Sequence, residues 1–485
     1  MTSTDERISR LEAQVARLLD VVAERDATIT KLNATIAKLN TRIAELEEKL
    51  GQNSSNSNKP PSSDPPGAGG AASGSGGGRT KASGRKRGGQ PGHGGSRRTL
   101  VPVDEVDALV DCFPPRCACC ARSLARRPDP DALRHQVTEV PQVKPHVTEY
   151  RQHAVACSCG HVTRGALPGG VSSVPFGARL IALAAALVGV YKLSRRAAQA
   201  LLWEMLGVRI SLGAISTCER RTSDALAAAH DEALAHARDA PIKHIDATSW
   251  YEARKYMHVW TLVTAAATVF RITKDGTTET VRSVLGRIKG VLVSDRATAF
   301  LFWRMSRRQI CWAHLLRKFV SFSEKGDEAG RIGTELLDYA TLVFTYWHPL
   351  KDGKIDRRRF RKYLRPIRSR VEMLLRRGSK IGAPRVSGSC EDILKHRAAL
   401  WTFVDHEGIE PTNNHAERAL RAAVIWRKTS LGTQSERGSR FVERILTATY
   451  TLRQHKRDVL GYLRDAVDAL MHGAPSPALL PAQAP

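Results

Sequence analysis

Apolar side chains recur every seven positions along the first fifty residues, a spacing that would place them in one stripe of a helix. Two series make up this stripe: Ile8, Val15, Val22, Ile29, Ile36, Ile43 and Leu50, and Leu11, Leu18, Leu32, Leu39 and Leu46. Only Arg25 interrupts the second series. β-Branched residues in the first series with Leu in the second favour a parallel two-stranded coiled coil. We therefore predict a leucine-zipper coiled coil over residues 1–50 that makes the protein a homo-oligomer; one amphipathic helix packed on its own domain is the alternative.

The pattern changes twice between residues 101 and 240. Over residues 101–175 the apolar runs are short and broken, as in a small module held together by metal. The apolar run Leu180–Tyr191 then predicts a buried helix, and two more helices follow on either side of Leu206-Gly207-Val208. This spacing predicts a helix-turn-helix-like DNA-binding region over residues 176–240, with a plain helical hairpin as the alternative.

Alternating and β-branched runs begin at Ile242 and predict a sheet. The runs are residues 242–250, 257–264, 268–274 and 290–295. Helical periodicity follows from Trp312, and the stretch from Asn413 to about His472 is again mainly helical. Between them, Lys351 to Lys380 contains 13 Lys or Arg against three acids.

Composition adds a partner to this outline. The chain has 485 residues, enough for two or three domains, and its net charge of +27 points to a polyanion such as nucleic acid. The run Leu180–Tyr191 is shorter than the roughly 18 residues that a membrane-spanning helix needs. The first residues, MTSTDERISR, do not have the apolar stretch of a secretory signal. We therefore expect a cytoplasmic protein without a membrane partner.

Residues 51–100 lack the apolar side chains that a folded core requires. From Arg79 to Arg98 this segment is basic, with glycines between the cations and no acid. We predict a flexible basic linker in which Arg85, Lys86 and Arg87 follow DNA phosphates or a narrow minor groove. A solvated linker without a ligand is the alternative.

Nine cysteines in a reducing compartment favour metal binding over disulfides. Two pairs, Cys117 with Cys120 and Cys157 with Cys159, supply the four thiolates of a tetrahedral structural Zn²⁺ site. We predict a cysteine-rich, zinc-binding-like module over residues 101–175; reduced cysteines without metal are the alternative.

Two acids belong to the predicted sheet. Asp246 lies in the first strand, at the edge of a buried sheet, and Asp295 ends the fourth, where ligands tend to bind. Two neighbouring carboxylates repel each other, and a divalent ion such as Mg²⁺ relieves this repulsion while also binding phosphate. Each acid taken alone could equally be an ordinary strand end.

A third acid, Glu417, falls in the first turn of a helix that Asn413 or Asn414 can cap. Four cations follow on the same helix: Arg418, Arg421, Arg427 and Lys428. A carboxylate among several cations suits a site that holds metal and DNA phosphates together. The order of Asp246, Asp295 and Glu417 on strand, strand and helix therefore predicts an active site, although Glu417 alone could be an ordinary helix-start acid.

Four blocks in this order, HIDATSWY, VLVSDRATAF, CWAHLLRKF and PTNNHAERALRAAVIWRK, resemble the catalytic blocks of transposases of the insertion sequence sixty-six family. The segments NSSNSNKPPSSD and GGQPGH, with the preceding zipper, resemble the N-terminal half of that family. The likeness covers nearly the whole chain. One departure is Cys157-Ser158-Cys159, which is closer together than the usual Cys-x-x-Cys half-site of zinc.

The resemblance implies an α/β ribonuclease-H-like catalytic core over residues 241–445, with a helical insertion at about 325–400 and a helical region and tail over 446–485. It implies that Asp246, Asp295 and Glu417 form a DDE triad that binds two Mg²⁺ or Mn²⁺ ions. One ion would activate a water or a 3′-hydroxyl, and the other would stabilise the leaving oxygen. For His314 and Trp312 of CWAH, packing is the expected role.

The function implied by this resemblance is DNA cleavage and strand transfer of a bacterial insertion sequence. The partners would be the element's terminal inverted repeats and target DNA in the nucleoid, together with small accessory proteins encoded beside the gene. Two alternatives stay open: a non-catalytic DNA-binding regulator or transposase relic, and a nuclease that hydrolyses DNA without joining strands.

Overall fold

The computed structural model describes residues 2–53, 56–57, 99–169, 171 and 174–481. The chain divides into two compact units. The larger comprises Met1–Gly76, Pro168–Ala198 and Leu212–Pro485, and the smaller comprises Gly77–Leu167 and Gln199–Ser211. Within the described part of the chain, no helix combines the length and the apolar character that spanning a bilayer requires.

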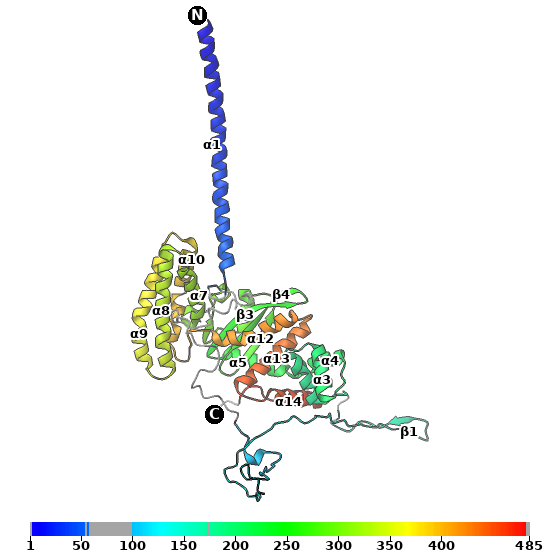
Figure 1. Ribbon diagram of the computed structural model, residues 1–485. Helices are drawn as coiled ribbons and strands as arrows, with labels where there is room; N and C mark the ends of the chain where they lie inside the picture. The colour runs from blue at the N-terminus through cyan, green and yellow to red at the C-terminus, as the bar shows by residue number, and fades with distance from the viewer. Residues whose placement is uncertain (1, 54–55, 58–98, 170, 172–173, 482–485) are drawn as a thin grey trace. The chain divides into compact units, whose positions relative to one another are not determined.

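Helix α1 (Thr2–Gly51) is one uninterrupted helix, labelled in Figure 1. Its heptad side chains are exposed in the single chain, from Leu46 at 45% to Leu50 at 86%. The helix expected from the heptads is present, and a coiled coil between copies stays a prediction. The predicted DNA-binding residues Arg85, Lys86 and Arg87 lie outside the described residues.

The smaller unit contains little regular structure in its described part. It has a short helix η3 (Val103–Glu105), an antiparallel hairpin of β1 (Ala154–Ala156) and β2 (Val162–Arg164), and the part of helix α3 (Arg195–Leu206) that follows Ala198. Apolar side chains such as Leu133 and Val137 are exposed. This agrees with the short, broken apolar runs of the sequence, which cannot build a core of their own.

The helices directly before the sheet are α2 (Ala178–Gly189), α3 (Arg195–Leu206), α4 (Leu212–Ala225) and α5 (Ala227–Asp239). Helix α2 is buried along most of its length, because its apolar residues pack against α4 and the C-terminal helix α14 (Val459–His472). Helices α3 and α4 match the two helices expected around Leu206-Gly207-Val208. Gly207 has φ of +65°, a conformation that favours glycine at the end of a helix.

A five-stranded sheet with the order β5-β4-β3-β6-β7 forms the centre of the larger unit (Figure 1). The strands are β3 (Ile242–Glu252), β4 (Lys255–Val263), β5 (Thr268–Thr273), β6 (Val291–Ser294) and β7 (Arg308–Ile310). β3, β4 and β5 pair antiparallel, whereas β6 and β7 join β3 in parallel. The expected position of Asp246 at a sheet edge is wrong, because β3 is the central strand. Its alternating pattern did not reveal how many strands flank it.

Helices α12 (Asn414–Ser430) and α13 (Glu436–Gln454) pack on the antiparallel half of the sheet. Three α13 side chains accept hydrogen bonds from backbone N–H groups of edge strand β5. The pairs are Thr268 N with Thr451 Oγ1 at 3.1 Å, Phe270 N with Thr447 Oγ1 at 3.0 Å, and Ile272 N with Glu443 Oε1 at 2.5 Å. These backbone N–H groups on the outer side of β5 are thereby hydrogen-bonded within the chain.

Helices fill the chain between the parallel strands and α12. α6 (Thr278–Leu285), η4 (Thr298–Phe300) and η5 (Met305–Arg307) lie before β7, and α7 (Trp312–Ser323) follows it. Then come α8 (Asp327–Lys351), α9 (Arg357–Gly378), α10 (Pro384–Lys395), η6 (Arg397–Leu400) and α11 (Thr402–Asp405). α7, α8, α9 and α10 share one apolar core with Trp312, Trp401 and Phe403.

Candidate active site

The register of two parallel strands places Asp246 beside Asp295. β3 and β6 pair in parallel, with His244 opposite Val293. Asp246 and Asp295 each lie two residues beyond this pair, so the two carboxylates leave the same end of neighbouring strands on the same face. Both side chains are partly exposed. The strand pairing therefore brings together the two acids that the sequence predicted.

Helix α12 supplies the third acid. Glu417 lies in its first turn. Asn413 is the N-cap residue of this helix, one of the two expected, but its side chain makes no capping hydrogen bond; its Nδ2 donates to Ile245 O at 2.7 Å and ties the helix start to β3. The hydroxyl of Thr261, the β4 partner of Asp246, is 3.4 Å from both Asp246 O and Ala416 O. Glu417 is thereby held next to Asp246 through backbone contacts on both strands.

The acids interact electrostatically. Burial, followed by the negative charges of Asp295 and Glu417, raises the pKa of Asp246 to about 8. A hydrogen bond from Ala247 N to Asp246 Oδ1 at 2.9 Å, and the positive charge of Arg317, act in the opposite direction. These groups do not balance the negative charge of the three acids, so this site favours an added cation.

Three side chains at the start of α7 surround Glu417. The Cys311 thiol is 3.7 Å from Glu417 Oε1, His314 Nδ1 is 3.6 Å from the same oxygen, and Arg317 Nη2 is 3.7 Å from Oε2. The pKa of His314 lies below its ordinary value, because burial lowers it more than the negative charge of Glu417 raises it. In the described chain, the group of three His, Cys, Asp or Glu residues whose ligand atoms all lie within 4.8 Å of one another is Cys311, His314 and Glu417. The three acids are therefore neighbours without forming so tight a cluster.

The sequence contained a signal for this group. Cys311, His314 and Arg317 are spaced by three residues in CWAHLLRKF, which puts them on one face of a helix. Packing was the expected role of both named residues of CWAH, and Trp312 fits it, being fully buried with Nε1 donating to Leu400 O at 2.8 Å. His314 instead faces Glu417, and its Nδ1 is buried without a hydrogen-bond partner.

The predicted DNA-binding cations of α12 divide into two kinds. Arg418, Arg421 and Lys428 have exposed side chains. Arg427 is partly buried, and its Nη1 donates to Ser249 O at 2.6 Å and Thr248 Oγ1 at 3.2 Å. Arg427 therefore fastens α12 to β3, whereas the other three remain accessible to phosphates.

Each predicted zinc half-site is a turn stabilised by backbone hydrogen bonds. Cys117 N donates to Arg122 O at 2.9 Å, and Cys157 N donates to His161 O at 2.8 Å. Backbone N–H groups of Cys120 and of Cys159 lower the pKa of the Cys117 and Cys157 thiols, respectively. Over the described residues, the four sulfurs are not gathered within 4.8 Å of one another. A shared zinc ion stays a prediction.

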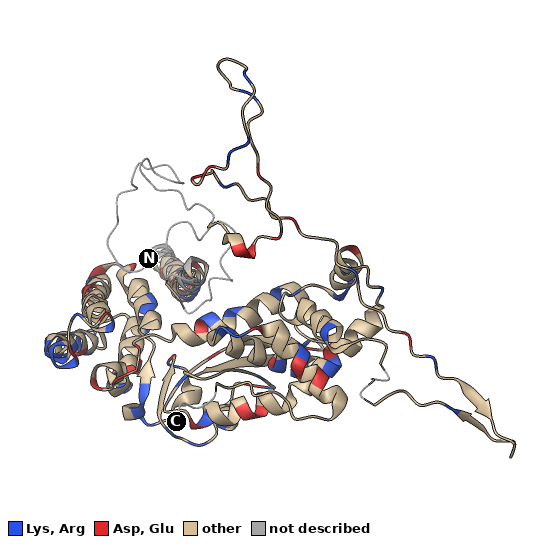
Figure 2. Ribbon diagram, turned by 90° about the horizontal axis from the view of Figure 1, so that it is seen from below, with Lys and Arg blue, Asp and Glu red and all other residues tan. Residues whose placement is uncertain are grey.

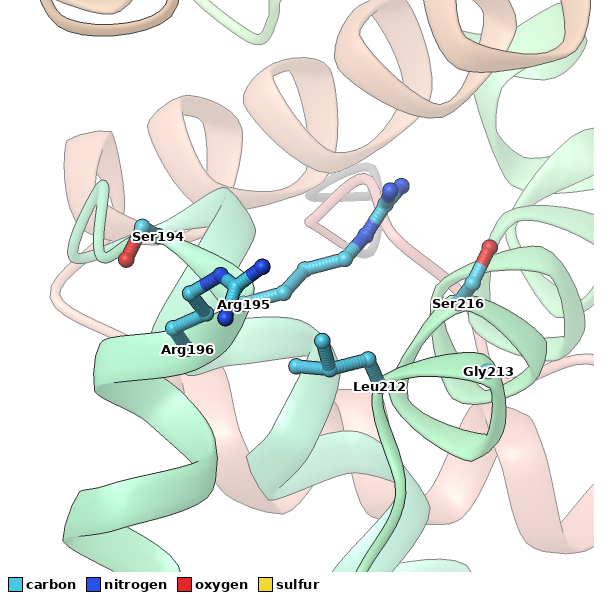
Figure 3. Close-up of a pocket in the computed structure, with 6 residues that line it drawn as sticks. All are labelled: Ser194, Arg195, Arg196, Leu212, Gly213 and Ser216. Atoms are coloured by element: carbon cyan, nitrogen blue, oxygen red, sulfur yellow. The ribbon is translucent and has the colours of Figure 1, made fainter.

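The starts of α3 and α4 line a pocket in the helix-turn-helix-like region. Figure 3 shows Ser194, Arg195 and Arg196 on one side and residues from the start of α4 on the other. Arg195 donates from Nε and Nη2 to the buried Glu219 carboxylate at 2.8 and 2.7 Å. This pair fastens the two helices together, and Arg196 keeps an exposed side chain. DNA binding by this region stays a prediction.

Comparison with known proteins gives the arrangement a family. The uncharacterized protein y4qI of Sinorhizobium fredii is 28% identical over 170 residues, which make up 34% of this chain and 31% of that protein. The chain thus aligns with about a third of this relative's length. A model described as a family of unknown function (DUF6444) matches residues 2–99. The Transposase IS66 family model matches residues 174–441, more than half of the chain, and the chain belongs to this family of transposases.

Proposed function

We propose that this protein catalyses metal-dependent DNA cleavage and strand transfer of an insertion sequence, with Asp246, Asp295 and Glu417 as its catalytic acids. The observation that carries this proposal is their convergence from the central strand β3, its parallel neighbour β6, and a helix packed on β3 and β4. The alternatives of a regulator or relic lack a reason to keep three acids at one point.

The core is then ribonuclease-H-like. Three antiparallel strands, continued by two parallel ones beside β3, support this assignment. Asp246 lies at the carboxyl end of the part of β3 that pairs in parallel, and Asp295 follows the carboxyl end of β6. Ligands bind at these ends in open α/β sheets. The helices α8, α9 and α10 form the insertion between the second and the third acid.

The three acids fit divalent ions of the Mg²⁺ or Mn²⁺ type. Carboxylate oxygens are the ligands that such ions prefer, and the raised pKa of Asp246 records a deficit of positive charge. When bound, two such ions would activate the attacking hydroxyl and stabilise the leaving oxygen of the phosphodiester.

The chain's own residues position the site and the DNA. Arg317 and His314 orient the Glu417 carboxylate, and Asn413 holds the start of its helix on β3. The exposed Arg418 and Arg421 offer charge to the DNA backbone on the same helix. The zipper would join copies, and the basic linker, the cysteine module with Zn²⁺ and the helix-turn-helix-like region would bind the terminal inverted repeats.

The test is cleavage of DNA that carries the gene with its flanking sequence. Asp295→Ala should retain DNA binding but lose Mg²⁺-dependent cleavage and joining at the element ends. Asp338→Ala is a matched control, because Asp338 is an exposed acid on α8. Equal cleavage by wild type and Asp295→Ala would refute the site. Binding of element ends without cleavage by the wild type would favour the regulator, and cleavage without joining would favour a nuclease.

A further inference from the structure

One face of α9 carries a row of cations. Arg358, Lys362 and Arg365 follow one another at four and three residues, and Arg376 continues the line three turns later. All four side chains are exposed. In Figure 2, α9 at the left edge of the molecule is drawn largely in blue. We call these four residues the outer stripe.

Among the described residues, the side chains of the outer stripe have no partner, in contrast to three other cations of α9, which pair with acids. Arg361 lies 3.8 Å from Asp405, Arg368 lies 3.5 Å from Glu372, and Arg377 lies 2.8 Å from Glu328. Across the described ranges, none of the four outer-stripe side chains forms an ion pair or a hydrogen bond. Arg361, Arg368 and Arg377 are therefore paired with acids, whereas the outer stripe keeps its positive charge unpaired.

This arrangement costs free energy in the isolated protein. Like charges three or four residues apart on a helix destabilise it by about 0.2–0.5 kcal/mol per pair. Arg358 with Lys362 and Lys362 with Arg365 are such pairs. A polyanion reverses the sign of this interaction, so a row of unpaired cations is adapted to an anionic ligand.

The shape of the stripe identifies the ligand. At 1.5 Å per residue, Arg358 and Arg376 are about 27 Å apart along the helix, or about eight base pairs of duplex DNA at 3.4 Å each. A membrane surface fits less well, because membrane-binding helices need an exposed apolar face. The apolar face of α9 is already buried against its neighbours through Phe360, Leu364 and Val371.

We propose that the outer stripe of α9 binds the phosphate backbone of duplex DNA, giving the helical insertion a direct part in holding DNA during transposition. The assignment rests on the proposed function and adds a surface to it. We expect contacts to phosphates, which position a duplex without reading its sequence, because the stripe consists of exposed cations spread over several helical turns.

The test is the salt dependence of binding to a short duplex of arbitrary sequence. The slope of log affinity against log salt falls by about 0.9 for each cation that no longer neutralises a phosphate. The variant Arg358→Gln/Lys362→Gln/Arg365→Gln should therefore lower the slope by about 2 to 3. The control Arg17→Gln/Lys31→Gln/Lys38→Gln removes the same charge from exposed positions of α1 and should leave the slope unchanged. Circular dichroism and the thermal midpoint check folding.

The outcomes separate this inference from the proposed function. A lower slope in the α9 variant alone supports the stripe. Equal slopes in the α9 variant and the wild type overturn it, even where the wild type still cleaves element ends. An equal decrease in both triple variants also overturns it, because net charge would then explain the effect. If the α9 variant unfolds, Lys362→Gln alone replaces it and should lower the slope by about 0.9; a slope equal to that of the wild type then overturns the proposal.

Discussion

Asp246 is the residue at which burial and charge act most strongly together. Its folded pKa of about 8 lies above its ordinary value of 3.8, so the folded protein binds a proton that the unfolded chain releases. Stability contributed by this proton is present at low pH and is lost as pH rises from about 3.8 to about 8. At neutral pH, the metal-free site therefore keeps Asp246 mainly protonated.

We predict that the thermal midpoint of the metal-free protein falls between about pH 5 and pH 8, and that Asp246→Asn lessens this fall. Mg²⁺ should raise the midpoint at pH 8 in the wild type and much less in the variant, because the ion replaces the proton. Asp338→Asn serves as the control. A pH profile identical in wild type and Asp246→Asn would show that the carboxyl is not perturbed.

Arg317 is a cation that acts on two of the three acids. Its Nη2 lies 3.7 Å from Glu417 Oε2, and its positive charge lowers the pKa of Asp246. Because a cation beside metal ligands repels the metal, Arg317→Gln should not weaken Mn²⁺ binding measured by calorimetry. Cleavage should fall roughly a hundredfold, as for removal of one charge-stabilising donor, with partial rescue by Arg317→Lys. Weaker Mn²⁺ binding with unchanged cleavage would contradict this role.

At the scale of elements, β7 is the strand that the alternation of apolar and polar residues did not predict. The first four strands alternate or are apolar, and all were predicted within two residues of their observed ends. β7 consists of Arg308, Gln309 and Ile310, yet all three are buried. Arg308 donates from Nε to Ser294 Oγ at 3.1 Å and from Nη2 to Asp295 O at 2.6 Å. These hydrogen bonds to residues of other elements allow a polar run to form a buried strand.

The same limit explains the site. The order of three acids in recognisable blocks was enough to predict Asp246, Asp295 and Glu417 as neighbours. Helix α7 starts directly after β7, and this start places Cys311, His314 and Arg317 beside Glu417. Because the sequence pattern did not predict β7, it could not predict where this helix would lie relative to Glu417. Asn413 stands at the expected N-cap position, but its side chain makes no capping hydrogen bond, because it bonds instead to the distant Ile245.

Helix α7 is anchored mainly through Trp312. Its ring is fully buried, with centroids 4.9 Å from Trp401 and 6.4 Å from Phe403, and its backbone N donates to Pro411 O at 2.9 Å. We predict that Trp312→Ala lowers the stability of the larger unit by about 3–5 kcal/mol, measured by urea unfolding. Leu342→Ala, at an exposed leucine of α8 in the same unit, should cost far less. Similar decreases in the two variants would contradict the anchoring role.

At the scale of the whole molecule, α1 is the element that a single chain leaves incomplete. The helix is 50 residues long, or about 75 Å at 1.5 Å per residue, and its apolar stripe is exposed along its length. A parallel partner helix would bury this stripe by packing each apolar side chain between side chains of the other copy. An oligomer would also bring several catalytic cores and α9 surfaces to the two ends of one DNA element.

We predict that deleting residues 1–50 lowers the molar mass of the assembly measured by light scattering. Ile29→Asp/Ile36→Asp should have the same effect, because two charges would enter the buried seam of the coiled coil. Ala23→Asp/Thr30→Asp adds the same charge next to the stripe, at positions that face solvent in the coiled coil, and should keep the wild-type mass. An unchanged mass after both the deletion and Ile29→Asp/Ile36→Asp would mean that α1 does not join copies of the chain. Its exposed stripe would then have to be covered by a partner of another kind.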